Sequence, residues 1–127
     1  MLAGAVARAE VLGIAQGASL AEIRAAWKQA VRENHPDAMI ARFGGEEFAL
    51  MVPHCTVPVL LKRLEGLRQQ LRQQPLSRET PLFVRASFGV INVGRVSMDE
   101  ALSEADRLLY QAKNTGRDKI VSQETAI

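Results

Sequence analysis

The sequence predicts a single α+β domain in which helices pack against a sheet, and three observations lead to this fold class. A diglycine, Gly44-Gly45, separates two segments that suit β-strands, and such pairs supply the positive φ angles of a hairpin turn. Leucines recur at helical spacing after residue 57, and capping boxes of the form Ser-x-x-Glu begin at Ser19 and Ser97. The chain of 127 residues has the size of one domain.

The N-terminal part is expected to be helical. Residues 1–17 are rich in alanine, with a short helix indicated from residue 3 to residue 12 and no strand pattern. A stronger helix is predicted over 19–33, because Ser19 and Glu22 can satisfy each other's exposed backbone N–H groups at its start. Its apolar stripe, in which Trp27 is the expected packing anchor, consists of Leu20, Ile23, Trp27, Ala30 and Val31.

Strands and helices alternate in the rest of the chain, which gives the predicted element order α-β-β-α-β-α-β. A leucine stripe marks the middle helix as one that covers a sheet, and Gly116 is placed as the C-terminal cap of the last helix. The predicted segments are strands at 38–43 and 46–52, a helix at 57–73, a strand at 82–92, a helix at 97–113 and a strand at 119–121.

Two adjacent carboxylates, Glu46 and Glu47, follow the diglycine and start the outgoing strand on opposite faces. Because glycines have no Cβ, Gly44 and Gly45 allow a ligand to approach the backbone closely. Hard divalent cations prefer oxygen ligands, so this tip can hold a cation that is bound to phosphates. The alternative is a plain hairpin whose acidic start faces solvent.

Composition argues against several classes of function. Lys and Arg number 16 against 14 Asp and Glu, a net charge of +2, and no basic run concentrates that charge, so no nucleic-acid surface is expected. No apolar run reaches the ~18 residues of a membrane span. The single cysteine, Cys55, forms no internal disulfide and, beside His54, lacks further ligands at zinc spacing. A reducing, cytoplasmic setting without a membrane partner is therefore expected.

Three separated segments resemble the motifs of one family, the GGDEF domain, which is the catalytic domain of bacterial diguanylate cyclases and converts GTP into cyclic di-GMP. The segments are Arg42-Phe43-Gly44-Gly45-Glu46-Glu47-Phe48, then Ala86–Val90, then Ala105–Lys113 with Gly116-Arg117 after it. The resemblance covers about residues 38–122 and implies a palm-like, ferredoxin-like sheet.

That family has a central first strand, which would precede residue 19, where this sequence indicates helix. We therefore expect the first family strand to be replaced by a helical segment. The strands at 46–52 and 82–92 then either pair directly as a βαβ unit or leave a gap that a second chain fills.

The resemblance also implies a site. In the family, an aspartate at the end of the first strand and the acidic third residue of the signature, here Glu46, hold two metal ions on GTP, which makes Glu46 and Glu47 the candidate catalytic acids. Lys113 and Arg117 match residues that contact the terminal phosphates, beside the backbone of Gly44 and Gly45.

The strand with the aspartate and the segment that binds guanine are both expected to be missing. The resemblance thus implies a domain related to cyclic di-GMP signalling that binds GTP or phosphate weakly and is catalytically inactive. Mg²⁺ or Mn²⁺ is the expected cofactor if nucleotide binding survives, and otherwise there is none.

A second resemblance covers residues 8–37. Val11–Ile14, Ala18–Lys28 and His35-Pro36-Asp37 resemble the first two helices and the HPD loop of a J-domain. This resemblance implies a DnaK-type chaperone as partner, bound through Arg24, Lys28, Arg32, His35, Pro36 and Asp37. The alternative is that Pro36 simply ends the helix.

The two resemblances meet at Asp37 without a linker, which suggests a chimera, natural or engineered. It would join a J-domain-like segment (1–37) to a truncated GGDEF-like segment (38–122) and a loose tail (123–127). A recombinant with a structural role only is the third hypothesis. A symmetric homodimer is expected, because the loss of a central strand leaves two unpaired sheet edges.

Overall fold

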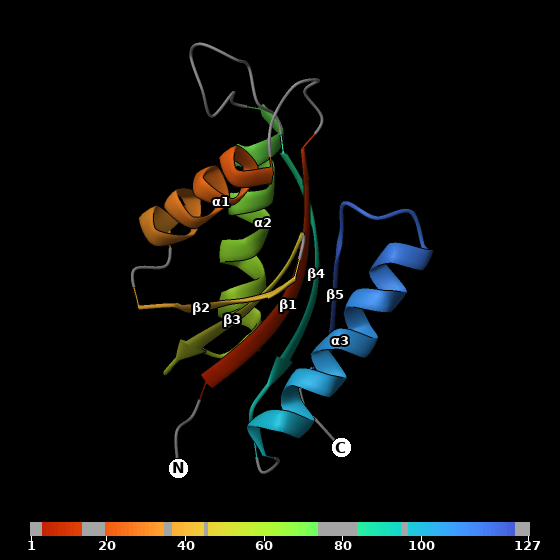
Figure 1. Ribbon diagram of the computed structural model, residues 1–127. Helices are drawn as coiled ribbons and strands as arrows, with labels where there is room; N and C mark the ends of the chain where they lie inside the picture. The colour runs from red at the N-terminus through yellow and green to blue at the C-terminus, as the bar shows by residue number, and fades with distance from the viewer. Residues whose placement is uncertain are drawn as a thin grey trace.

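The computed structural model describes residues 4–13, 20–34, 37–44, 46–73, 84–94 and 97–123. Within them the chain folds as an α+β domain in which helices cover both faces of a five-stranded mixed sheet (Figure 1). The fold class predicted from the sequence is confirmed. In chain order the elements are β1 (Gly4–Gly13), α1 (Leu20–Asn34), β2 (Met39–Gly44), β3 (Glu47–Pro53), α2 (Val57–Gln73), β4 (Val84–Asn92), α3 (Met98–Asn114) and β5 (Ile120–Gln123).

The N-terminal strand β1 is the centre of the sheet, whose strand order is β2-β3-β1-β4-β5. It pairs antiparallel with both β3 and β4, while β5 runs parallel to β4 at one edge. The predicted helix over residues 3–12 is therefore wrong, and so is the expectation that a helical segment replaces the first strand. The element order is β-α-β-β-α-β-α-β rather than α-β-β-α-β-α-β.

Alternation of side chains explains why an alanine-rich segment forms this strand. Ala5, Ala7, Ala9 and Val11 are fully buried in the core beneath α1 and α2, whereas Glu10 points to the opposite face. Alanine exceeds ordinary residues in helix propensity by at most about 0.7 kcal/mol each, which two hydrogen-bonded ladders outweigh. Both predicted ways of joining β3 to β4, direct pairing or a strand from a second chain, are wrong because β1 lies between them.

The larger core lies between the sheet and the pair α1 and α2, which Figure 1 shows on the same face. Trp27 of α1 is fully buried, and its ring centroid lies 5.8 Å from that of Phe48 and 5.9 Å from that of Phe88. The prediction of Trp27 as a packing anchor is confirmed. The predicted stripe of α2 is also fully buried: Leu60, Leu64, Leu67 and Leu71.

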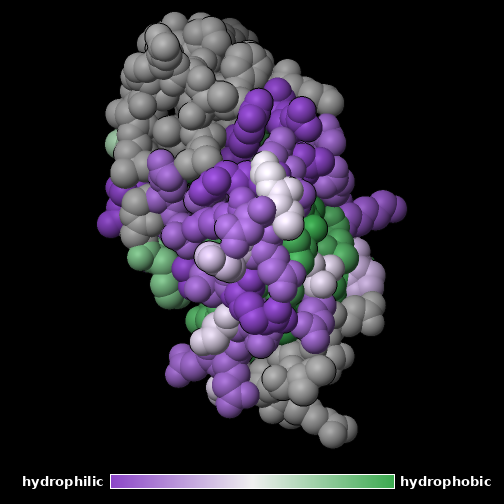
Figure 2. Space-filling view, turned by 90° about the vertical axis from the view of Figure 1, so that its right-hand side faces the viewer, coloured by the Kyte–Doolittle hydropathy of each residue, from purple (hydrophilic) through white to green (hydrophobic). Residues whose placement is uncertain are grey.

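Helix α3 packs on the opposite face, over β1 and β4. Its predicted cap is present, because Ser97 Oγ accepts a hydrogen bond from the Glu100 backbone N–H at 3.1 Å. Gly116 follows the helix with φ +113°, and the Arg117 N–H bonds back to the Ala112 carbonyl, as a glycine cap requires. The outer side of α3 is largely hydrophilic (Figure 2).

None of the three helices in the described part of the chain combines the length and the apolar character that crossing a bilayer requires. The predicted loose tail lies outside the described residues except for Gln123, the last residue of β5. His35 and Pro36 also lie outside them. Of the other residues proposed to bind a chaperone, Lys28, Arg32 and Asp37 are exposed and Arg24 is partly buried.

Candidate functional site

The predicted hairpin is formed by β2 and β3, with Gly44 as the last residue of β2 and Gly45 outside the described residues. The ladder shifts register between Arg42 and Gly44, so the two strands meet at the turn through an irregularity. Glu46 is exposed in this turn, and its carbonyl accepts a hydrogen bond from the Val11 N–H at 2.9 Å. The turn is thereby attached to the central strand.

Two carboxylates lie side by side next to this turn. Glu10 of β1 and Glu47 of β3 are directly paired in the antiparallel ladder, so their side chains share a face of the sheet. The Glu10 side chain is 9% exposed and that of Glu47 is 35% exposed. The expected loss of the first strand is therefore wrong, and the strand β1 brings a carboxylate, Glu10, next to Glu47.

Helix α3 and the turn after it bring two cations to this pair. Lys113 Nζ lies 3.4 Å from Glu10 Oε2 and 3.3 Å from Glu47 Oε2, so one ammonium group bridges both carboxylates. Arg117 Nε donates to Glu10 Oε1 at 2.8 Å. A carboxylate this deeply buried needs such partners, because an unpaired buried charge is strongly destabilising. The four side chains form a compact cluster at the corner between β1, β3 and α3.

Arg8 extends the cluster along β1. Its Nη2 lies 3.3 Å from Glu47 Oε1 and 3.4 Å from Asp106 Oδ1 of α3. Its guanidinium carbon is 4.1 Å from the ring centroid of Phe43, a cation–π geometry next to the diglycine. The Nε of this largely buried side chain has no hydrogen-bond partner among the described residues. Arg8 therefore links β1, β2, β3 and α3 at the site.

The corner fits a divalent cation only in part. Among the described residues, no three His, Cys, Asp or Glu side chains are placed to hold a metal ion. Glu10 and Glu47 are nevertheless close enough to share one positive charge, that of Lys113. Mg²⁺ commonly uses one or two carboxylates and takes its other oxygens from water and substrate phosphates. The residues thus fit a metal that arrives with a phosphate ligand rather than one held by the protein alone.

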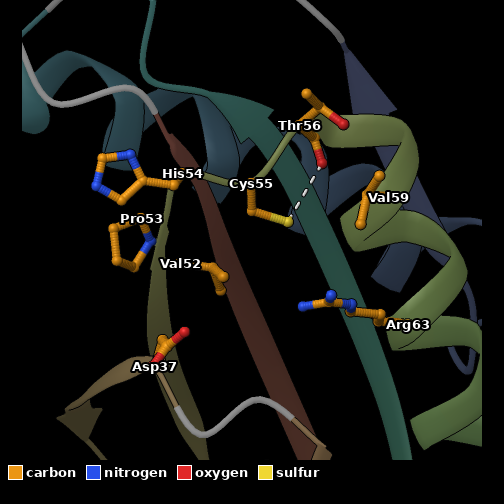
Figure 3. A pocket seen from close by; sticks show the side chains of 8 residues that line it. All are labelled: Asp37, Val52, Pro53, His54, Cys55, Thr56, Val59 and Arg63. Carbon is orange, nitrogen blue, oxygen red and sulfur yellow. Dashed lines mark hydrogen bonds between the residues drawn. The ribbon is translucent and has the colours of Figure 1, made fainter.

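A separate pocket of about 650 Å³ lies where β3 leads into α2 (Figure 3). Asp37 lines it from the turn that precedes β2, and Arg63 extends toward the strands from α2. His54 and Cys55 point to opposite sides of the chain, and Cys55 Sγ lies 3.5 Å from the Thr56 carbonyl oxygen. Asp37 thus takes part in a pocket between a strand and a helix, not in a loop between two antiparallel helices.

The structure brings together some of the predicted site residues and separates others. Glu47, Lys113 and Arg117 meet in one cluster, and in this cluster the described ion pairs involve Glu47 rather than Glu46. Glu10 and Arg8 belong to the cluster but were not predicted, since residues 3–12 were interpreted as helix. The alternation of alanines with larger residues from Ala5 to Glu10 is the signal that could have identified them.

Comparison with known proteins agrees with this fold. The family model "Diguanylate cyclase, GGDEF domain" matches residues 12–119. The diguanylate cyclase VdcA of Vibrio cholerae is 34% identical over 85 residues, 63% of this chain and 25% of VdcA. The uncharacterized protein YhcK of Bacillus subtilis is 31% identical over 109 residues, 83% of this chain and 30% of its own length. The chain thus spans less than a third of these relatives.

Solved structures show the same architecture. The GGDEF domain of DgcB from Caulobacter crescentus, in complex with c-di-GMP, matches with a TM-score of 0.77 at 20% identity, over 95% of this chain and 78% of that chain. The active GGEEF domain of a diguanylate cyclase from Vibrio cholerae matches with a TM-score of 0.73 at 17% identity, over 94% and 82% of the two chains. At these identities the likeness concerns the fold.

The family match also decides between the two resemblances. The match begins at residue 12 and continues through Asp37, the residue at which the two parts of a chimera would be joined. Helix α1 packs through Trp27 on the same sheet as the rest of the chain. A J-domain, a chaperone partner and a chimera therefore have no support. The chain belongs to the GGDEF family, the family of diguanylate cyclase domains.

Proposed function

We propose that this domain binds the triphosphate of GTP together with Mg²⁺ or Mn²⁺ at the corner between β1, β3 and α3. The observation that carries the proposal is the ammonium group of Lys113, 3.4 Å from Glu10 and 3.3 Å from Glu47. Two carboxylates that share one cation can also serve a divalent ion whose remaining oxygens come from phosphate and water. Relatives named as diguanylate cyclases support GTP as the nucleotide.

Lys113 and Arg117 supply the phosphate contacts in this proposal. Both now neutralise Glu10, so a metal–nucleotide complex has to exchange these ion pairs for new ones. The carboxylates of Glu10 and Glu47 would then hold the metal, while the Lys113 ammonium and the Arg117 guanidinium would contact phosphate oxygens, the guanidinium through a bidentate fork. Because bonds are exchanged rather than added, the affinity for GTP is expected to be weak.

We also propose that the domain does not by itself convert GTP into cyclic di-GMP. β1 and α1 are connected by residues 14–19, whose sequence Ile-Ala-Gln-Gly-Ala-Ser contains no carboxylate. A guanine base presents N–H donors on its Watson–Crick edge, and sites that read a base hydrogen-bond this edge. Of these six side chains only Gln16 and Ser19 can hydrogen-bond a base, so we expect two GTP molecules to be held too loosely for the alignment that cyclisation requires.

Two further expectations belong to this proposal. Because β1 lies between β3 and β4, a missing strand gives no reason for a homodimer. An apolar hollow between β2, β3 and α3, however, leaves Met39, Phe43 and Met98 between 39% and 57% exposed. Such a patch favours association with a second copy. The free thiol of Cys55 supports a reducing, cytoplasmic setting.

The test has a binding arm and a turnover arm. GTP is titrated into the protein by calorimetry with Mg²⁺ and again with chelator, and Lys113→Ala and Glu10→Gln should each weaken Mg²⁺-dependent binding about tenfold or more. Arg107→Ala serves as the control, because Arg107 pairs with Glu104 on the outer side of α3. Chromatography after incubation with GTP and Mg²⁺ or Mn²⁺ should show no cyclic di-GMP above background.

Each arm can contradict its own part of the proposal. Product formation that disappears on Glu46→Ala or Glu10→Ala refutes the lack of turnover. No heat of binding at millimolar GTP, or equal binding with and without Mg²⁺, refutes the metal–nucleotide site.

A further inference from the structure

The turn that carries Arg117 has an unfavourable backbone. Gly116 has φ +113°, and the two residues after it, Arg117 at +60° and Asp118 at +51°, also lie in the left-handed region. Residues other than glycine rarely adopt this region, and two in succession need support from the surrounding structure. The Arg117 side chain itself is 52% exposed, so its own packing does not fix it.

Helix α2 supplies that support through Arg68, whose side chain is only 12% exposed. Arg68 Nη1 donates to the Asp118 carbonyl oxygen at 3.0 Å and to its carboxylate at 3.2 Å. Its Nε and Nη2 donate to the carboxylate of Glu65 at 3.0 and 2.6 Å, which holds the guanidinium plane. Arg72 lies 3.5 Å from the Asp118 carboxylate, and the Asp118 N–H donates to buried Ser87 Oγ at 2.8 Å.

Two adjacent residues of the turn thus face opposite sides of the sheet. Arg117 reaches Glu10 on the face that α3 covers, and Asp118 reaches Arg68 on α2, which covers the other face. We propose that Arg68 and Asp118 are positioning residues, which fix this turn so that Arg117 is held at the candidate phosphate site. The part of this inference that concerns nucleotide binding rests on the function proposed above. The orientation of Arg117 toward Glu10 is a property of the free protein.

The first experiment therefore needs no nucleotide. Hydrogen exchange of the Arg117 Nε–H is followed by ¹⁵N NMR in the wild type, in Arg68→Gln and in Asp118→Asn. Exchange should become about tenfold faster in both variants, because the hydrogen bond to Glu10 opens more often. Arg107→Gln is the matched control, since Arg107 also pairs with a glutamate three residues earlier but lies on the outer side of α3.

The second experiment measures affinity for Mg²⁺–GTP in the same variants. Arg117→Ala should weaken binding about tenfold, and Arg68→Gln should weaken it by a similar factor. In the Arg117→Ala background Arg68→Gln should then have almost no further effect, since both changes remove one interaction. Arg68→Lys keeps the charge without the fork and should restore part of the loss.

These outcomes separate positioning from general destabilisation. If Arg68→Gln only lowers the stability of the protein, it weakens binding by the same factor whether residue 117 is arginine or alanine. Such additive effects overturn the inference. Unchanged Arg117 Nε–H exchange in both Arg68→Gln and Asp118→Asn also overturns it. If the wild type does not bind Mg²⁺–GTP, the proposed function fails, and the exchange measurement still decides the positioning role.

Discussion

Helix α3 packs directly on the backbone of β4 at Gly89, and the substitution Gly89→Ala tests this packing. A Cβ at residue 89 would lie 2.1 Å from the Ala105 carbonyl oxygen, 2.3 Å from the Leu109 backbone nitrogen and 2.9 Å from the Leu108 carbonyl carbon. All three are main-chain atoms, so no side-chain rotation relieves the contact. The helix would have to move by more than an ångström to restore ordinary van der Waals distances.

The expected cost follows from two opposing terms. Overpacking in a closed core costs about 1–3 kcal/mol, and contacts with a rigid helix backbone place this site at the upper end. Removal of a glycine from a strand interior offsets roughly 0.5–1 kcal/mol. The free energy of unfolding should therefore fall by about 2 kcal/mol. Because α3 carries Lys113, its displacement should also weaken GTP binding.

Urea unfolding followed by Trp27 fluorescence measures this effect, since the indole is fully buried on the other face of the sheet. Gly66→Ala is the matched control, because a Cβ at residue 66 of α2 meets nothing within 4 Å. The control should stabilise the protein by about 0.5–1 kcal/mol through helix propensity. A Gly89→Ala variant as stable as the wild type would refute the close packing of α3 on β4.

Two other predictions concern pH and assembly. The side-chain hydrogen bond from Arg68 lowers the pKa of Glu65 below its ordinary value of 4.5, with burial acting in the opposite sense. The decrease in the free energy of unfolding that Glu65→Gln causes should therefore be largest above pH 4.5 and shrink as the pH falls through the lowered pKa. Urea unfolding of both proteins across a pH series measures this decrease, and a decrease that stays constant with pH contradicts the prediction. Light scattering over a dilution series should show a dimer that Met39→Ser weakens, and a strictly monomeric mass at tens of micromolar would show the dimer prediction to be wrong.

Sequence patterns predicted the elements whose periodicity and local chemistry agree. The leucines of α2 repeat at helical spacing, and all four are fully buried. The capping residue Ser97 and the terminal Gly116 bound α3 as expected. Where propensity, pattern and cap all indicate the same structure, the prediction holds.

The first strand was missed because these signals disagree there. Alanine-rich composition favours a helix, whereas the alternation of Ala5, Ala7 and Ala9 with larger residues favours a strand. Pairing with both β3 and β4 decides the outcome, and such pairing is not visible in a local window of sequence. The same limit explains why Arg8 and Glu10 were not predicted as site residues, since their partners Asp106 and Arg117 lie about a hundred positions away in the chain.

The charges of the site show why metal and nucleotide should bind together. Glu10, Glu47 and Asp106 are opposed by Arg8, Lys113 and Arg117, so the free cluster is already neutral. A metal ion alone would displace Lys113 from both carboxylates and leave its ammonium group unpaired, while a triphosphate alone would draw Lys113 and Arg117 away and leave Glu10 buried and unpaired. Each ligand removes the cost that the other creates, and the coupling is reciprocal. Glu10, which β1 carries, thus belongs to the site proposed for a metal–nucleotide complex, and under the same proposal turnover depends on how the base is held.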